Sequence, residues 1–326
     1  MKTYIHSLSS YVPLKRVSNQ ELAENLDTSD EWIVSHTGIK FRHIAAENEA
    51  SSDLGIEAAK KVLDKAGMTP DEIDLIITGT ASPDHPGFPS TACIIQDKIG
   101  AHNAGAMDLL AACTSFIYGI ETAKNFIAGG SVKKVLVIGT EAISTIVDWN
   151  DRDCVLFGDG AGAAIVCENT ENNESDIIDS YLRAEGSGAK HLTRHAGGSR
   201  STFHINAPKE DLYLKMNGRQ VYTFAVRALC DTVKILLERN NVTIDDLRWV
   251  VPHQANTRII EAAAKRLGYS VDKFFVNIDE FANTSAASVP IALDDMLNKD
   301  LLRRGDLIMT IGFGGGLTYG GNLLRW

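Results

Sequence analysis

The chain lacks several features that would assign it to particular classes of protein. No stretch approaches eighteen uninterrupted apolar residues, so we expect no transmembrane helix. No run of lysine and arginine stands out and the formal net charge is −10, which argues against non-specific binding to nucleic acid. With 8 prolines and 27 glycines in 326 residues, the composition is neither fibrous nor of low complexity. Any acidic partner must therefore meet a local basic patch.

The cysteines show no Cys-x-x-Cys spacing. There are five of them: Cys93, Cys113, Cys154, Cys167 and Cys230. An odd number without paired spacing fits neither a disulfide framework nor a zinc site, so we expect a reducing compartment and no bound metal. Residues 1–17 contain no continuous apolar segment of the kind found in secretory signals. The sequence thus predicts a soluble, cytoplasmic protein.

What the chain does contain is an alternation of helical and strand patterns. Residues 53–67 have apolar positions at helical spacing and precede an apolar strand at 74–82. Residues 115–130 read as a second helix, followed by a buried strand at 132–139. Such alternation predicts an α/β fold in which helices cover a largely parallel sheet.

The second half of the chain repeats the first. Residues 71–79 match 245–253, residues 132–139 match 305–312, and residues 112–116 match 282–286. Three blocks in one order at nearly one separation indicate a duplication, which we divide into halves 1–175 and 176–326.

This match predicts where three polar residues lie. It puts Cys113 and Asn283 at the starts of equivalent helices and His253 at the end of a strand. Ligand sites of α/β sheets gather at the carboxyl ends of strands, so we expect one crevice between the halves to contain all three residues.

Short motifs along the chain have the order and spacing of a known enzyme family. They are TSDEWI (28–33), TGI (37–39), GFPSTA (87–92), LLAACTSF (109–116), LFGDGAGAA (156–164), PHQAN (252–256), NTSAASVP (283–290) and GFGGGLTYG (312–320). Over almost its entire length the chain resembles β-ketoacyl-acyl-carrier-protein synthase III, an initiating condensing enzyme of the thiolase-fold superfamily. The resemblance implies a thiolase-like fold, with duplicated α/β halves and mixed sheets in an αβαβα layered arrangement.

Cys113 is the candidate nucleophile. A thiol with a pKa of ~8.5 is only a few per cent thiolate near neutrality, and a position at a helix N-terminus is expected to lower that pKa. The small residues around Cys113 leave room for a substrate. The alternative is a buried structural cysteine, which is the interpretation we give to the other four.

His253 and Asn283 are the candidate donors to a developing negative charge. Loss of carbon dioxide from a malonyl thioester builds charge on the thioester oxygen, and uncharged N–H donors stabilise that enolate. The alternatives are a histidine at an ordinary strand exit for His253 and a helix N-cap for Asn283. The joint match with Cys113 favours the catalytic interpretation.

The resemblance implies further site residues. The N–H groups of Cys113 and Gly315 would form an oxyanion hole, Trp32 would stack on the adenine of coenzyme A, and Arg152 and Asn256 would hold the rest of the donor. For Trp32 the alternative is a half-buried aromatic side chain. Coenzyme A is then a substrate handle, and no cofactor or metal is implied.

Two surfaces complete the expected site. The resemblance makes Arg258, Lys265 and Arg266, on one helical stripe, the docking patch for an acidic carrier protein, with a solvated helix face as the alternative. Phe88 would cross the interface of a homodimer to floor the partner's acyl pocket, with a core phenylalanine as the alternative.

The chain departs from the family pattern near the donor entrance. His36 stands where the family usually has arginine, Thr223 replaces a common lysine, and the stretch 152–157 is one residue shorter. These differences predict a weakened or reshaped entrance for the anionic donor.

The implied reaction joins an acyl-coenzyme A primer to malonyl-acyl carrier protein, with loss of carbon dioxide, at the start of fatty acid synthesis. The alternatives are a relative that handles unusual acyl groups in secondary metabolism and a non-catalytic binding protein. A degradative thiolase would need a second catalytic cysteine near the C-terminus, where 312–320 has none.

Overall fold

The computed structural model describes residues 2–170, 173–201 and 208–326. The helices are α1 (Asn19–Ala23), α2 (Asp30–Thr37), α3 (Ser51–Ala66), α4 (Thr91–Ile99), α5 (Ser115–Ala128), α6 (Gly218–Asn240), α7 (Thr257–Leu267), α8 (Ile278–Phe281) and α9 (Ser288–Asn298). The strands are β1 (Thr3–Tyr11), β2 (Lys15–Ser18), β3 (Phe41–Ile44), β4 (Leu75–Gly79), β5 (Gly105–Leu109), β6 (Lys134–Glu141), β7 (Gly160–Glu168), β8 (Asp176–Ala184), β9 (Leu192–Arg194), β10 (Leu214–Met216), β11 (Trp249–Pro252), β12 (Leu307–Gly314) and β13 (Thr318–Arg325). The helices and strands predicted around 53–82 and 115–139 are therefore confirmed.

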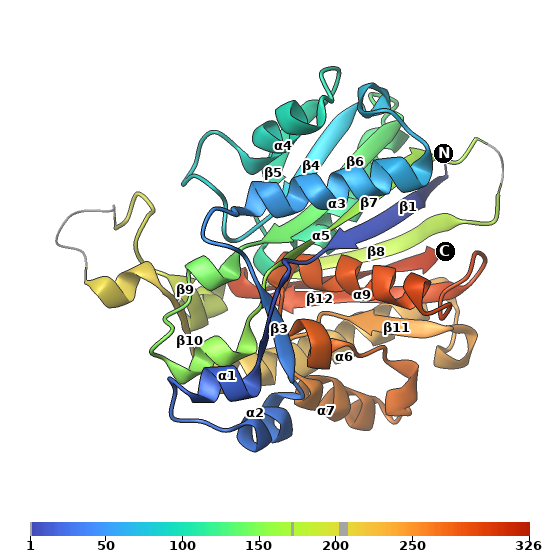
Figure 1. The fold of residues 1–326 in the computed structure, drawn as a ribbon. Coiled ribbons are helices and arrows are strands. Elements are labelled where there is room, and N and C mark those ends of the chain that lie inside the picture. The colour runs from blue at the N-terminus through green and yellow to red at the C-terminus, as the bar shows by residue number, and fades with distance from the viewer. Residues whose placement is uncertain (1, 171–172, 202–207) are drawn as a thin grey trace.

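Two sheets form the centre of the molecule (Figure 1). In the part of the chain that the structure describes, the first sheet has five strands in the order β1-β7-β6-β4-β5 and the second has four in the order β11-β12-β13-β8. Strands β6, β4 and β5 are parallel to one another, as are β11 and β12, while β7, β1, β13 and β8 run antiparallel to their neighbours. The prediction of a largely parallel sheet was wrong, because two antiparallel strands are added to the parallel strands of each sheet.

Three apolar clusters hold five layers together. Helices α3 and α4 pack on the outer face of the first sheet, and α6 and α7 pack on the outer face of the second. Helices α5 and α9 lie between the sheets, where their apolar side chains form one cluster with residues of both sheets. Strand β4 alternates accordingly, with Leu75 and Ile77 facing the central helices and Ile76 facing α3. The layered αβαβα arrangement is confirmed.

The structure also corrects one block of the sequence repeat. Helix α5 is preceded by a 3₁₀ turn, Ala112–Thr114, and α9 is preceded by the turn Ser285–Ala287. Each turn opens with a residue in the left-handed region, Ala112 at φ 46° and Ser285 at φ 48°. The equivalent of Cys113 is thus the residue after Ser285, and Asn283 lies before the turn rather than at the helix start.

None of the described helices is long and apolar enough to cross a bilayer.

Candidate active site

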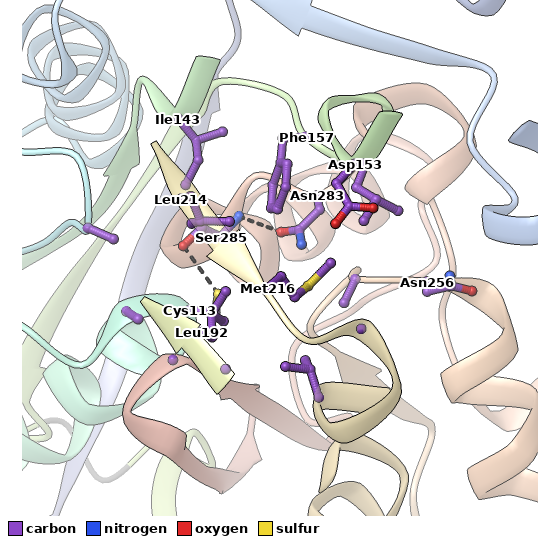
Figure 2. A pocket seen from close by; sticks show the side chains of 18 of the residues that line it. Cys113, Ile143, Asp153, Phe157, Leu192, Leu214, Met216, Asn256, Asn283 and Ser285 are labelled. Carbon is purple, nitrogen blue, oxygen red and sulfur yellow. Dashed lines mark hydrogen bonds between the residues drawn. The ribbon is translucent and has the colours of Figure 1, made fainter. Parts of the chain in front are cut away.

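One cavity of about 690 Å³ contains the three residues that the sequence predicts to act together. Cys113, His253 and Asn283 all line it, and so do Trp32 and Arg152 at the expected donor entrance. Its walls come from both halves of the chain and include strands β9 and β10 and the start of α6, of which Leu192, Leu214 and Met216 are labelled in Figure 2. Both halves therefore contribute to a single site.

Cys113 is the central residue of the 3₁₀ turn that precedes α5. Its Sγ accepts a hydrogen bond of 3.3 Å from the hydroxyl of Ser285, which enters from the opposite half. The space beside the sulfur depends on Gly314, because a Cβ there would stand 2.7 Å from the Cβ of Cys113 and 2.8 Å from its Sγ. The glycines of the 312–320 motif thus make room for the nucleophile.

The expected lowering of the Cys113 pKa was wrong. The pKa of the thiol is raised to about 11, chiefly by burial and to a smaller extent by the nearby carboxylate of Glu141. Hydrogen bonds from Ser285 and from the N–H groups of Gly315 and Cys113 lower the pKa, but their effect is smaller than that of burial. Helix position alone could not predict this outcome, because the burial of the thiol that dominates it depends on the folded structure around Cys113. The free site holds a thiol.

His253 directly follows β11 and is held in place by its backbone, whose N–H donates to the Ile311 carbonyl at 2.7 Å. Burial lowers the pKa of the imidazole to about 3, so the ring is neutral near pH 7. Among the described residues, no hydrogen-bond partner faces the buried Nδ1. A proton on Nδ1 would have no acceptor, so the proton belongs on Nε2, where it can be donated to a ligand.

Asn283 lies next to the first half, with its N–H donating to the Leu156 carbonyl at 2.9 Å. Its Oδ1 accepts the N–H of Ser285 at 2.9 Å, which fixes the orientation of the amide (Figure 2). The carbonyl oxygen is therefore occupied, and the NH₂ group remains available to the cavity. The N-cap alternative is only partly correct, because this local bond orders the approach to the turn while α9 itself begins at Ser288.

The oxyanion hole remains a prediction with one supporting observation. The N–H groups of Gly315 and Cys113 are both close enough to the Cys113 sulfur to lower its pKa. Both backbone donors therefore lie near the sulfur that would carry the acyl group, as an oxyanion hole requires.

Trp32 at the entrance is already in contact with two side chains. The ring of His36 stacks on it at 4.3 Å with an angle of 15°, and the guanidinium of Arg152 lies 4.4 Å from the ring centre. Thr223, the other substituted position, points away on α6 and donates to the Arg219 carbonyl, while its neighbour Tyr222 lines the cavity.

Helix α7 is anchored to α2 at the edge of the cavity. Asn256 caps α7 by accepting the N–H of Arg258 at 2.9 Å, and its NH₂ group donates to the His36 carbonyl at 3.0 Å. The guanidinium of Arg258 donates to the Ser35 carbonyl at 2.8 Å. Arg258, Lys265 and Arg266 are all exposed, but Arg258 is engaged within the chain.

Phe88 is not a core residue, because 88% of its surface is exposed. It is also not among the described residues that line the cavity of its own chain. The alternative of a buried phenylalanine was therefore wrong, and the contact with a partner subunit stays a prediction.

Sequence reasoning missed Ser285 and Glu141. Ser285 belongs to the NTSAASVP motif, but nothing in that pattern says that its hydroxyl reaches the Cys113 sulfur. Glu141 is the last residue of β6, and the rule that sites gather at the carboxyl ends of strands could have found it. Within the described residues, no group of three or more His, Cys, Asp or Glu side chains could hold a metal ion.

The arrangement defines a site for acyl transfer: a thiol at a backbone-lined turn, faced by a neutral imidazole and an oriented amide. Family models described as 3-oxoacyl-[acyl-carrier-protein] synthase III match residues 107–186, and the C-terminal model of the same name matches 237–326. The β-ketoacyl-[acyl-carrier-protein] synthase III of Clostridium acetobutylicum is 49% identical over 97% of this chain and 96% of its own length.

Solved structures agree. The 3-oxoacyl-[acyl-carrier-protein] synthase III of Aquifex aeolicus has a TM-score of 0.91 at 43% identity, covering 99% of this chain and all of its own. That of Pseudomonas aeruginosa PAO1 has a TM-score of 0.92 at 36% identity, covering 100% and 98%. The chain belongs to the β-ketoacyl-acyl-carrier-protein synthase III family. It is accordingly an acyl-transferring condensing enzyme with the thiolase fold.

Proposed function

We propose that the protein catalyses the decarboxylative Claisen condensation of an acyl-coenzyme A primer with malonyl-acyl carrier protein, the initiating step of fatty acid synthesis. The observation that carries this proposal is the single cavity shared by Cys113, His253 and Asn283. The relatives at 45–49% identity bear the name β-ketoacyl-[acyl-carrier-protein] synthase III, which supports this reaction over the alternative of a specialised acyl transfer.

In the first half-reaction the sulfur of Cys113 attacks the acyl carbonyl and coenzyme A leaves as the free thiol. The N–H groups of Cys113 and Gly315 stabilise the tetrahedral oxyanion in this proposal. In the second, malonyl-acyl carrier protein loses carbon dioxide to give an enolate, which attacks the acyl carbon. The product is 3-oxoacyl-acyl carrier protein, and Cys113 leaves as the thiolate and takes a proton from solvent to restore the thiol.

His253 and Asn283 act in the second half-reaction. A neutral Nε2–H and an amide N–H can both donate to the enolate oxygen without adding a charge to the cavity. Burial lowers the pKa of His253 to about 3, so the ring is uncharged near pH 7. This supports a role as a hydrogen-bond donor rather than as a general acid.

The decisive experiment is intact-protein mass spectrometry after mixing with a panel of acyl-coenzyme A donors. Wild type should gain one acyl group, and Cys113→Ser should gain none, because a hydroxyl is a far weaker nucleophile in this site. Cys93→Ser, which alters an exposed cysteine outside the cavity, is the matched control and should be acylated like wild type. Acylation of the Cys113→Ser protein at full rate would contradict the proposal.

We also propose that each chain consists of the halves 1–175 and 176–326 and that two chains form a cytoplasmic homodimer. Arg258, Lys265 and Arg266 would dock the carrier protein. Strand β5 supports the dimer, because it is an edge strand whose residues are partly exposed and which a second copy could cover. Exposure of the three basic side chains on an acidic protein supports the docking patch.

A further inference from the structure

The hydroxyl of Ser285 is in direct contact with the reacting sulfur. It donates a hydrogen bond of 3.3 Å to the Sγ of Cys113, and both residues line the cavity (Figure 2). Ser285 comes from the second half of the chain, 172 positions after Cys113 in the sequence. This hydroxyl therefore touches the atom at which the thioester forms and breaks.

The backbone of the turn before α9 holds the Ser285 side chain in this position. Ser285 is buried, opens the turn and has a left-handed φ of 48°. Its N–H donates to the Oδ1 of Asn283 at 2.9 Å, and the N–H of Ala287 donates to the Thr284 carbonyl at 3.0 Å. None of these contacts uses the hydroxyl, so the hydroxyl can be removed by mutation while the turn and the orientation of Asn283 are kept.

A hydroxyl donor suits a sulfur whose charge changes during the reaction. The sulfur of Cys113 is negative when it attacks the acyl group and negative again when the product leaves. Hydrogen bonds to a charged acceptor are roughly twice as strong as those to a neutral one, so the hydroxyl stabilises the thiolate more than the thiol or the thioester. Burial of the sulfur opposes its ionisation, which makes each donor to it more important.

We infer that Ser285 is a further catalytic residue, whose hydroxyl stabilises negative charge on the Cys113 sulfur in both half-reactions. This inference deepens the proposed function and rests on Cys113 as the nucleophile. In acylation the thiol proton passes to solvent, the sulfur forms its bond to the acyl carbon, and the bond from that carbon to the coenzyme A sulfur breaks. The coenzyme A sulfur takes a proton from solvent and leaves as the thiol. Ser285 keeps its own proton throughout.

In condensation the same hydrogen bond assists the reverse change at the sulfur. The enolate carbon bonds to the acyl carbon, and the bond between that carbon and the Cys113 sulfur breaks. The sulfur carries the bonding electrons away as a thiolate, to which the Ser285 hydroxyl donates until solvent protonates it. Decarboxylation itself places no charge on this sulfur and should not depend on the hydroxyl.

Alkylation by iodoacetamide tests the hydrogen bond without any substrate. The reaction of Cys113 is followed over a range of pH by mass spectrometry of its peptide, and below the pKa of the thiol the rate rises about tenfold per pH unit with the thiolate fraction. Ser285→Ala should slow alkylation about tenfold at each pH, the usual worth of a hydrogen bond to a charged group. A merely loosened turn would do the opposite, because exposure removes the burial that raises the pKa of Cys113.

The two half-reactions then separate the hydroxyl of Ser285 from its backbone. Single-turnover acylation by a short acyl-coenzyme A should be about tenfold slower in Ser285→Ala. Release of carbon dioxide from malonyl-acyl carrier protein should be nearly unchanged, because the N–H that orients Asn283 remains. Ser285→Gly removes the same hydroxyl and suits the left-handed backbone, so it provides the answer where Ser285→Ala does not fold.

Ser288→Ala is the matched control. It removes a buried hydroxyl from the same segment, but that hydroxyl accepts the Gln254 N–H at 2.7 Å and is not among the described groups that line the cavity. Alkylation and acylation of Cys113 should therefore be as in wild type. Unchanged or faster alkylation in a folded Ser285 variant, an equal loss in Ser288→Ala, or a parallel loss of decarboxylation would each overturn the role of the hydroxyl. A wild type that is alkylated but gains no acyl mass would instead contradict the proposed function.

Discussion

The imidazole of His253 and the amide of Asn283 face the cavity as uncharged donors, each oriented by a backbone contact. His253→Ala and Asn283→Ala should still form the acyl-enzyme, because neither side chain is needed until the enolate forms. Decarboxylation should fall by roughly 10²–10³-fold in each variant, the usual cost of one such donor. Asn283→Asp preserves the shape but puts a negative charge beside the enolate, so it should be at least as impaired as Asn283→Ala.

The pH dependence of decarboxylation gives a second test of the role of His253. An ordinary histidine becomes charged as pH falls through ~6.5, but burial lowers the pKa of His253 to about 3. The folded protein therefore keeps this ring neutral over the whole range from about pH 8 to 5. Decarboxylation by the preformed acyl-enzyme should show no titration of a histidine in that range. A rate that follows a group with a pKa near 6.5 would contradict the assignment.

At the scale of helices and strands, the sequence predicted the layers better than it predicted which residues of the two halves are equivalent. Apolar spacing is sufficient to predict α3, α5, β4 and β6, since burial on one or both faces is encoded residue by residue. The match of 112–116 to 282–286 was displaced because both segments contain Thr-Ser, whereas the structural equivalence depends on left-handed residues at Ala112 and Ser285. Alanine and serine give no hint of such a conformation.

The site shows the same division. Cys113, His253 and Asn283 were predicted because each carries chemistry in its side chain and stands in a motif. Glu141 influences the pKa of Cys113 because the end of β6 and the turn before α5 meet in space. No spacing along the chain encodes that meeting or the burial of the thiol. Neither the raised pKa of Cys113 nor the hydrogen bond from the Ser285 hydroxyl to its sulfur could therefore be predicted.

The exposed face of α7 makes a prediction about the second substrate. Lys265→Glu combined with Arg266→Glu should raise the KM for malonyl-acyl carrier protein by roughly tenfold at low salt, since each exposed charge pair is worth up to ~1 kcal/mol. The effect should shrink at high salt, and acylation by acyl-coenzyme A should be unaffected. Lys60→Glu combined with Lys299→Glu changes the net charge equally on other surfaces and should leave the KM unchanged. A KM that rises as much in this control would mean that α7 is no docking site.

For the whole molecule, the exposed ring of Phe88 predicts both assembly and chain-length preference. Sedimentation should show a homodimer, because a two-fold contact would supply one such ring to each pocket. Phe88→Thr should admit longer acyl chains to Cys113, which the mass shifts over a ladder of donors would show. Since 88% of the side chain is exposed in the single chain, the substitution should cost far less than the ~3–5 kcal/mol of a core phenylalanine. A monomer, or an unchanged ladder, would exclude the cross-subunit pocket floor.

The turns Ala112–Thr114 and Ser285–Ala287 approach the sheets closely, which has a consequence for synthesis on the ribosome. A Cβ at Gly312 of β12 would stand 3.2 Å from the Cα of Thr114, and one at Gly139 of β6 would stand 2.3 Å from the Ala286 carbonyl oxygen. Each half therefore seats its turn against a strand of the other. Cys113 emerges long before Gly312, so the growing chain carries its nucleophile without the surface that shapes it. We therefore expect the thiol to take an acyl group only after β12 has been made and has docked, so that released chains truncated before β12 should gain no acyl mass.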